Sequence, residues 1–175
     1  MTVAPPVIEK LREIVGQQRV LTDETSFQQY GVDRTTLWSP SPGVVVLPGS
    51  TEEVQAIIQL ANAERIAVVP SGGRTGLSGG AVALNGEIVL VLDRMNEVVA
   101  FNAIDRSVTV QAGMITQQLQ AFAEQQGLFY PVDFASTGSS QIGGNIATNA
   151  GGIKVIRYGM TRNWVLGLKV VSGNG

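Results

Sequence analysis

The chain has 175 residues, which is enough for one domain with a core of its own. Its net charge of −2 gives no electrostatic case for binding nucleic acid or an anionic membrane, and no apolar run suits a transmembrane helix. The sequence contains no cysteine and no histidine, which excludes disulfides, thiolate metal sites, thiol nucleophiles and a Ser-His-Asp triad. Any redox chemistry would therefore depend on a cofactor.

Residues 1–42 are expected to form a helix followed by an irregular lead-in. Apolar residues between Val7 and Val15 recur at helical spacing, after two prolines and before Gly16. Residues 17–42 carry turn signals and show no clear periodicity. The first residues lack the basic start and apolar core of a secretion signal, so we expect a cytoplasmic location.

A strand–helix–strand unit is predicted next, with apolar strands over residues 43–48 and 66–69. Between them, Ser50-Thr-Glu-Glu53 matches a capping box, with Ser50 as the N-cap and Glu53 reaching back to it. A helix between two apolar strands predicts a parallel pair joined by a right-handed crossover.

Strands and helices alternate along the rest of the chain. The expected elements are a strand, a hairpin, a helix and a final strand: residues 88–92, 98–101 with 107–111, 115–123, and 165–171. The turn signal Ser172-Gly-Asn-Gly175 follows the final strand directly, where a partner strand is expected to come next. We therefore expect the chain to be a fragment or a truncated gene product.

The stretch Pro70-Ser-Gly-Gly-Arg-Thr-Gly-Leu-Ser-Gly-Gly80 follows a predicted strand. Glycine lets the backbone approach a ligand closely, and successive N–H groups then form a concave nest that binds phosphate. The glycine spacing differs from the Rossmann fingerprint, and the Gly-Lys-Ser/Thr of a P-loop is absent. A flexible linker is the alternative, although linkers are not usually flanked by buried strands. Arg74 could pair with a phosphate or be an exposed loop arginine.

A second glycine-rich stretch runs over residues 138–152 and interleaves apolar residues with glycine at helical spacing. It predicts a short helix whose N-terminal amides could face an anion. Asn145, Thr148 and Asn149 could hydrogen-bond the edge of a heteroaromatic ring, and the alternative is that the small residues serve close packing only. The two stretches together predict a binder of a large phosphate-containing cofactor.

Several other residues are candidates for a functional role. The segment Lys154-Val-Ile-Arg-Tyr-Gly159 is consistent with a cofactor contact and equally with a solvated turn. Trp38 and Trp164 are predicted to be packing residues. The aspartates are scattered, so no metal site is predicted: Asp93, Asp105 and Asp133.

The two glycine stretches, in this order and followed by Arg157-Tyr-Gly, resemble the FAD-linked oxidases of the vanillyl-alcohol oxidase type, with their PCMH-type FAD-binding domain. Within that family the chain is most similar to D-2-hydroxy-acid dehydrogenases: D-lactate dehydrogenase, D-2-hydroxyglutarate dehydrogenase and the FAD-linked subunit of glycolate oxidase. Val32-Asp-Arg-Thr, residues 44–54 and residues 108–113 also fit, so the resemblance covers nearly the whole chain.

The resemblance implies an α+β fold in which two α/β subdomains sandwich FAD, with residues 1–42 as lead-in and 43–175 as an incomplete PCMH-type domain. The implied reaction is oxidation of a D-2-hydroxy acid by hydride transfer to flavin, with electrons leaving to a quinone, a flavoprotein or a cytochrome. In relatives with covalent flavin a histidine often replaces Arg74. With no histidine or cysteine in the chain, the FAD is expected to be non-covalent.

The family continues past this point with a substrate domain, so no catalytic residue is assigned and the isolated chain is expected to be inactive. The alternative is a non-catalytic FAD-binding subunit, or a truncated product without the substrate domain. The resemblance assigns one set of residues to the FAD pyrophosphate and a second set to the flavin and its linking chain. The first set is Pro70, Ser71, Gly72, Gly73, Arg74, Thr75, Gly76, Leu77, Ser78, Gly79 and Gly80. The second set is Pro131, Ser136, Thr137, Gly143, Gly144, Asn145, Ala147, Thr148 and Asn149.

Overall fold

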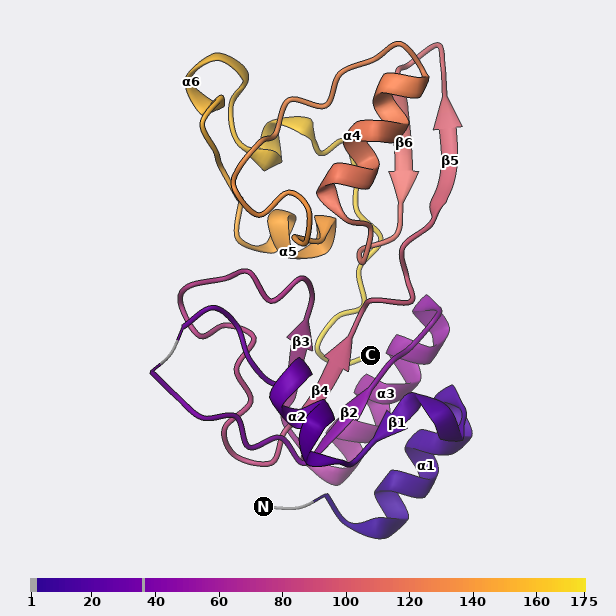
Figure 1. Cartoon of the computed structure of the whole chain (residues 1–175). Helices are drawn as coiled ribbons and strands as arrows, with labels where there is room; N and C mark the ends of the chain where they lie inside the picture. Colours follow the sequence, from indigo (N-terminus) through magenta and orange to yellow (C-terminus); the bar gives the residue numbers. More distant parts are fainter. Residues whose placement is uncertain (1–2, 36) are drawn as a thin grey trace. The chain divides into compact units, whose positions relative to one another are not determined.

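The computed structural model describes residues 3–35 and 37–175 (Figure 1). These residues form two compact units. Unit 1 contains the described residues up to Arg94 together with Val170–Gly175, and unit 2 contains Met95–Lys169. Parallel strand pairs in unit 1 and an antiparallel hairpin in unit 2 give the chain an α+β fold, as predicted.

Unit 1 is built on a four-stranded sheet with the order β1-β2-β4-β3. The strands are β1 (Val20–Leu21), β2 (Val44–Val46), β3 (Val68–Ser71) and β4 (Ile88–Val91). The two strands that flank the helix are parallel, as predicted, but the prediction that they pair with each other was wrong, because β4 lies between β2 and β3 and is parallel to both. All four residues of β4 are buried, as expected for a central strand covered on both faces.

Helices cover both faces of this sheet (Figure 1). On one face, α1 (Pro5–Val15) and α3 (Thr51–Glu64) pack against alternate strand residues such as Val44 and Ile88. On the other face, the intervening residues Val45 and Val89 meet α2 (Glu24–Tyr30). The alternation follows from the two-residue period of side chains along a strand.

The predicted N-cap of α3 is confirmed, with one change. Ser50 Oγ accepts the N–H of Glu53 at 3.1 Å. Glu53 Oε2, however, accepts the N–H of Gly49 at 2.7 Å rather than that of Ser50. The carboxylate therefore satisfies the amide one residue before the N-cap.

The region 17–42 is less irregular than the sequence suggested. It contains a short 3-10 turn, η1 (Gln17–Arg19), then β1 and α2. Asp23 is the N-cap of α2, and its Oδ1 accepts the N–H of Ser26 at 2.9 Å. These elements were missed because each is too short to show a periodic pattern.

Unit 2 begins with the predicted hairpin, β5 (Val98–Asn102) and β6 (Ser107–Val110). The helix α4 (Thr116–Gln125) follows, and the predicted helix in the second glycine stretch is α5 (Ile142–Ala147). Two further single turns are α6 (Val155–Tyr158) and η2 (Thr161–Trp164). A small core of Met114, Leu119 and Ile142 joins α4 and α5.

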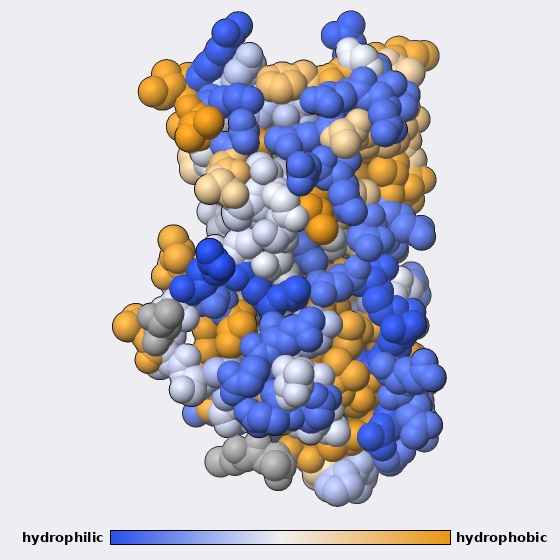
Figure 2. Space-filling view, viewed as in Figure 1, coloured by the Kyte–Doolittle hydropathy of each residue, from blue (hydrophilic) through white to orange (hydrophobic). Residues whose placement is uncertain are grey.

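The predicted strand over residues 165–171 is not present. In the described part of the chain no segment forms a ladder with it, and a strand requires a partner backbone however apolar its sequence. Its alternate side chains Leu166 and Leu168 are 85% and 62% exposed. Hydrophobic side chains also gather over α6, where Ile156 is fully exposed (Figure 2). Among the described residues no helix combines the length and apolarity needed to cross a bilayer.

Candidate functional site

The first glycine stretch leaves the sheet of unit 1 at the end of β3. Pro70 and Ser71 still belong to β3, where they lie opposite Leu90 and Val91. From residue 72 to residue 80 the backbone forms an irregular segment, which we call the glycine loop. No backbone N–H group of residues 72–78 donates a hydrogen bond to any other described residue. A run of unused N–H donors is the arrangement that binds an anion through the backbone.

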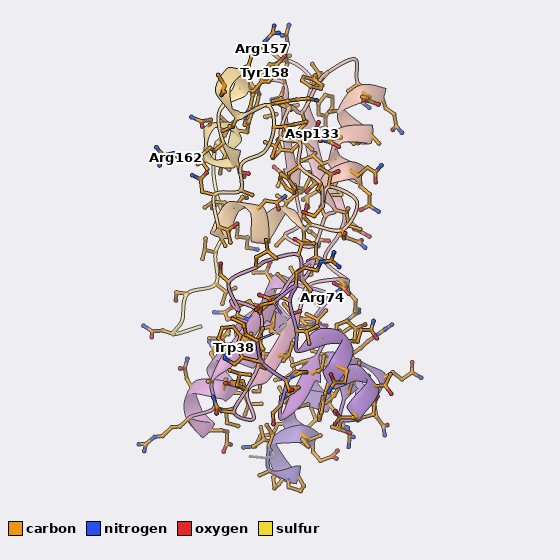
Figure 3. The ribbon with its side chains drawn as sticks, turned by 60° about the vertical axis from the view of Figure 1, so that its left-hand side comes forward. Trp38, Arg74, Asp133, Arg157, Tyr158 and Arg162 are labelled. Carbon is orange, nitrogen blue, oxygen red and sulfur yellow. The ribbon has the colours of Figure 1, made fainter. Side chains whose placement is uncertain are left out.

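Arg74 anchors the start of the glycine loop. Its backbone has φ of 57°, in the left-handed region. Its Nη2 lies 3.3 Å from Asp93 Oδ2, and its guanidinium lies over the ring of Tyr30 with 5.1 Å to the centroid. The side chain is 21% exposed. Arg74, labelled in Figure 3, is therefore not the exposed loop arginine considered from the sequence. Its charge is already balanced by Asp93.

The far end of the glycine loop is held by residues of the segment between α2 and β2. Asp33 Oδ2 accepts the N–H of Gly79 at 2.8 Å, and the N–H of Arg34 donates to the carbonyl of Gly76 at 2.9 Å. Trp38 lies against Gly79, where a Cβ atom would come within 2.5 Å of the indole ring. Gly79 has φ of 77°, so both its backbone conformation and its neighbour require glycine. Sequence reasoning missed these contacts, of which the one between Asp33 and Gly79 joins residues 46 positions apart.

The second glycine stretch, in unit 2, is more firmly bonded within the protein. The N–H of Ile142 donates to Met114 and the N–H of Gly143 to Ala112, both at 2.8 Å. The prediction that the first amides of this helix face an anion was therefore wrong for these two groups. A Cβ atom at Gly143 would lie 2.9 Å from that of Ala112, so this glycine permits close packing.

Asn145 also differs from the sequence expectation. Its side chain is buried, with Nδ2 donating to Thr116 Oγ1 at 2.7 Å. Thr116 Oγ1 lies 2.8 Å from Ser140 Oγ, which completes a buried polar cluster. Asn145 therefore connects α5 to the start of α4 and does not present its amide to a ring edge.

The open face of α5 consists of other predicted residues. Gly144, Ala147 and Thr148 are exposed, three and four positions apart on one side of the helix. Asn149 follows with φ of 49°, and its Oδ1 accepts the N–H of Arg162 at 3.1 Å. Within unit 2, these residues leave a surface of small side chains that a flat group can approach.

The remaining predicted residues of unit 2 lie in the turns before α5. Pro131 is fully buried. The carbonyl of Ser136 accepts the N–H groups of residues 139 and 140, and the carbonyl of Thr137 accepts the N–H of Gln117. Ser136 and Thr137 themselves are partly exposed, so their hydroxyls remain accessible.

The two cationic side chains that follow the second glycine stretch, Lys154 and Arg157, both contact neighbouring residues. Lys154 Nζ lies 2.9 Å from Asp133 Oδ2 and 5.2 Å from the ring centroid of Phe129. The Arg157 guanidinium lies over the ring of Tyr158, also at 5.2 Å (Figure 3). These contacts favour the solvated-turn interpretation over a cofactor contact. The tryptophans pack only in part, since Trp38 and Trp164 are 46% and 43% exposed.

Residues 42–175 match the family model described as FAD binding domain. The chain belongs to this FAD-binding domain family. Its sequence is 60% identical over 171 residues to a D-2-hydroxyglutarate dehydrogenase of Stutzerimonas stutzeri, a match that covers 98% of this chain and 37% of that protein. It is 38% identical over 174 residues to a D-lactate dehydrogenase of Anaerostipes hadrus, covering 99% of this chain and 36% of that protein. The chain thus spans about a third of the length of these relatives.

Solved structures confirm the fold. Alkyldihydroxyacetonephosphate synthase superposes with a TM-score of 0.85 at 21% identity, over 93% of this chain and 32% of that one. p-Cresol methylhydroxylase superposes with a TM-score of 0.64 at 17% identity, over 83% of this chain and 29% of that one. The resemblance to PCMH-type flavoproteins is therefore confirmed at the level of fold.

The glycine loop of this FAD-binding domain has the donors that a pyrophosphate requires. The N–H groups that donate to no described residue belong to consecutive residues, and no acidic side chain lies between Pro70 and Gly80. Two carboxylates that contact the loop, those of Asp33 and Asp93, are each bonded to it, one to a backbone N–H and the other to Arg74. The residues present therefore fit a diphosphate group bound through the backbone.

Proposed function

We propose that the chain forms the FAD-binding part of a dehydrogenase that oxidises a D-2-hydroxy acid, with D-2-hydroxyglutarate as the first substrate to test. The observation that carries the proposal is the 60% identity to a D-2-hydroxyglutarate dehydrogenase over almost the whole of this chain. The D-lactate dehydrogenase relative supports the wider substrate class. The similarity to the FAD-linked subunit of glycolate oxidase, the identity of the electron acceptor and the cytoplasmic location remain predictions.

In this proposal the residues of the chain bind and orient the cofactor. The N–H groups of residues 72–78 would hold the pyrophosphate, and the small residues Gly144, Ala147 and Thr148 would lie along the flavin or its linking chain. Bound FAD would supply hydride-accepting chemistry that none of the side chains present can supply. We assign no catalytic residue within the chain.

The chain would hold FAD without a covalent bond. It contains no histidine and no cysteine, the side chains that form the common covalent links to flavin in this family. Arg74, at the position where a histidine often stands in covalent relatives, is bonded to Asp93. A protein–flavin complex that releases all its flavin on denaturation is the expected result.

A visible absorption spectrum tests the proposal directly. The purified chain is mixed with FAD, desalted, and compared with the same chain without added FAD. A retained flavin band that moves into the supernatant on acid precipitation supports non-covalent binding. A chain that stays colourless after desalting at high FAD concentration contradicts the proposal for these residues.

A non-catalytic FAD-binding subunit is the second candidate. The observation that favours it is the absence of an assignable catalytic side chain in a chain without histidine or cysteine. The two candidates differ in whether a D-2-hydroxy acid bleaches the flavin band when oxygen is excluded. Bleaching in a protein that contains this domain and the remainder of a relative supports the dehydrogenase.

A further inference from the structure

The glycine loop is held by side chains near its start and at its end, whereas the N–H groups of residues 72–78 donate no hydrogen bond to any other described residue. At the start, Arg74 is fixed by Asp93 and Tyr30. At the end, Asp33 accepts the N–H of Gly79 at 2.8 Å. Residues 75–78 lie between these anchors, and no other described residue accepts a hydrogen bond from their N–H groups.

We propose that Asp33 is a positioning residue for the cofactor site, and that it keeps the glycine loop in the conformation that binds a diphosphate. This inference rests on the proposed function and extends it. Asp33 lies before residue 42, where the match to the FAD-binding family model begins. The site of this chain would therefore extend into the segment that precedes the matched domain.

The geometry of Asp33 suits an anchoring role. Its Oδ1 accepts the N–H of Thr35 at 2.8 Å, which fixes the carboxylate relative to its own backbone, while Oδ2 accepts the N–H of Gly79. The next residue, Arg34, donates its N–H to the carbonyl of Gly76 at 2.9 Å. One short segment thus binds the loop through a donor and an acceptor, at two positions three residues apart.

Anchoring matters for binding because a free glycine-rich loop has many conformations. Ordering such a loop when the ligand binds costs conformational entropy, and glycine loses more of it than other residues do. A loop already held at both ends loses less entropy on binding, so its affinity for the ligand is higher. Asp33 would raise affinity by this route without touching the ligand.

The charge of Asp33 supports an indirect role. A carboxylate beside a diphosphate repels it, so Asp33 would not be expected next to such a site as a ligand. Both of its oxygens accept backbone N–H groups, which disperses the charge. We therefore place Asp33 as an anchor of Gly79 and not as a ligand of the diphosphate.

The first experiment compares Asp33→Ala with Asp23→Ala in the full chain. Asp23 is the matched control because it also accepts a backbone N–H, that of Ser26 at 2.9 Å, and lies in the same region of unit 1. It forms no hydrogen bond with the glycine loop among the described residues. Both variants lose an anchored carboxylate, but only one of them frees the loop.

Two readouts separate positioning from general stability. Hydrogen exchange of the peptide covering residues 72–80, measured without ligand, is expected to speed up in Asp33→Ala and to stay at the wild-type rate in Asp23→Ala. The Kd values for FAD and for ADP, which carries the diphosphate without the flavin, are expected to rise about tenfold in Asp33→Ala only. Asp33→Asn keeps one acceptor oxygen and is expected to fall between wild type and Asp33→Ala.

A second variant covers the case in which Asp33→Ala does not fold. Gly79→Ala forces a Cβ atom against Trp38 at a position with φ of 77°, and is expected to weaken FAD and ADP binding. Gly16→Ala is its control, because Gly16 also has a positive φ, 89°, but no neighbour within 4 Å of a Cβ. Wild-type Kd values in Gly79→Ala would overturn the inference.

The outcomes distinguish this inference from the proposed function. If wild type binds FAD and Asp33→Ala binds it equally well, the inference is wrong and the proposed function stands. If the loop exchanges no faster in Asp33→Ala, the anchoring role is wrong whatever the ligand data show. A wild-type chain that binds neither FAD nor ADP overturns the proposed function, and with it the cofactor role of Asp33.

Discussion

Asn145 Nδ2 donates a hydrogen bond to Thr116 Oγ1 at 2.7 Å, and both side chains are buried. Asn145 lies on α5 and Thr116 at the first turn of α4, so this bond joins the two helices of unit 2 that carry its core. Ser140 closes the cluster through its own hydroxyl. Asn145 was expected to contact the cofactor. In the structure its buried side chain instead links α5 to α4.

Asn145→Ala is expected to destabilise unit 2 by about 1–3 kcal/mol, because it leaves the buried hydroxyls of the cluster with one partner fewer. Thr148→Ala is the control, since Thr148 is exposed and its hydroxyl donates, among the described residues, only to the carbonyl of Gly144 in the adjoining helix. Denaturant unfolding measures both. Equal stabilities for the two variants would show that the buried cluster contributes little.

The adjacent glycines of α5 are expected to respond differently to a methyl group. Gly143→Ala places a Cβ atom 2.9 Å from that of Ala112, an overpacked contact that is expected to cost about 1–3 kcal/mol. Gly144→Ala meets nothing within 4 Å and gains helix propensity of up to about 1 kcal/mol. Thermal unfolding of the two variants should therefore shift in opposite directions. A stabilising Gly143→Ala would mean that α5 can move away from Ala112.

The features that were predicted correctly from the sequence are those with a local signal. The helix after the first prolines, the Ser50 N-cap and the hairpin around residues 103–106 each follow from neighbouring residues. The order of strands could not be predicted in this way. Packing places β4 between β2 and β3, and the sequence of a strand does not show which strands lie beside it. The strand predicted over residues 165–171 failed for the same reason, because the sequence does not show whether a partner strand is present.

In the candidate site, too, features with a local sequence signal were predicted and contacts between distant residues were not. The high glycine content identified the loop after β3, because glycine lets a backbone approach a ligand closely. The carboxylates that hold the loop, Asp33 and Asp93, lie far from Gly79 and Arg74 in sequence, at separations of 46 and 19. The role of Asn145 was misjudged because an amide side chain suits a buried hydroxyl cluster as well as a ligand. The start of α2 could have been predicted from Asp23, because its spacing to Ser26 is that of an N-cap residue to the amide it accepts.

Alkaline pH is expected to destabilise unit 2 through Tyr130. Burial raises the pKa of the Tyr130 phenol from 10.0 to about 12. In the unfolded chain the phenol ionises near its ordinary pKa, whereas the folded protein holds it neutral. Ionisation of Tyr130 therefore favours the unfolded state above about pH 10. The free energy of unfolding is expected to fall as pH rises from about 10 to 12.

Tyr130→Phe removes the ionisable group while keeping the ring that lies edge-on to Trp164. The variant is expected to unfold at the same denaturant concentration at pH 9 and at a higher concentration than wild type at pH 11. The difference in phenolate absorbance between the wild-type protein and Tyr130→Phe follows the titration of Tyr130. A parallel decline in both proteins would assign the alkaline loss to other groups.

A hybrid enzyme is the most demanding prediction of the proposed function. Residues 1–175 would replace the matching third of the Stutzerimonas stutzeri dehydrogenase, to which they are 60% identical. We expect a hybrid that holds non-covalent FAD and reduces an artificial electron acceptor in the presence of D-2-hydroxyglutarate. The hybrid carrying Asp33→Ala should purify with less FAD, and added FAD should restore its turnover if the substitution affects only cofactor binding. A folded hybrid that retains FAD but never oxidises the acid would favour the non-catalytic alternative.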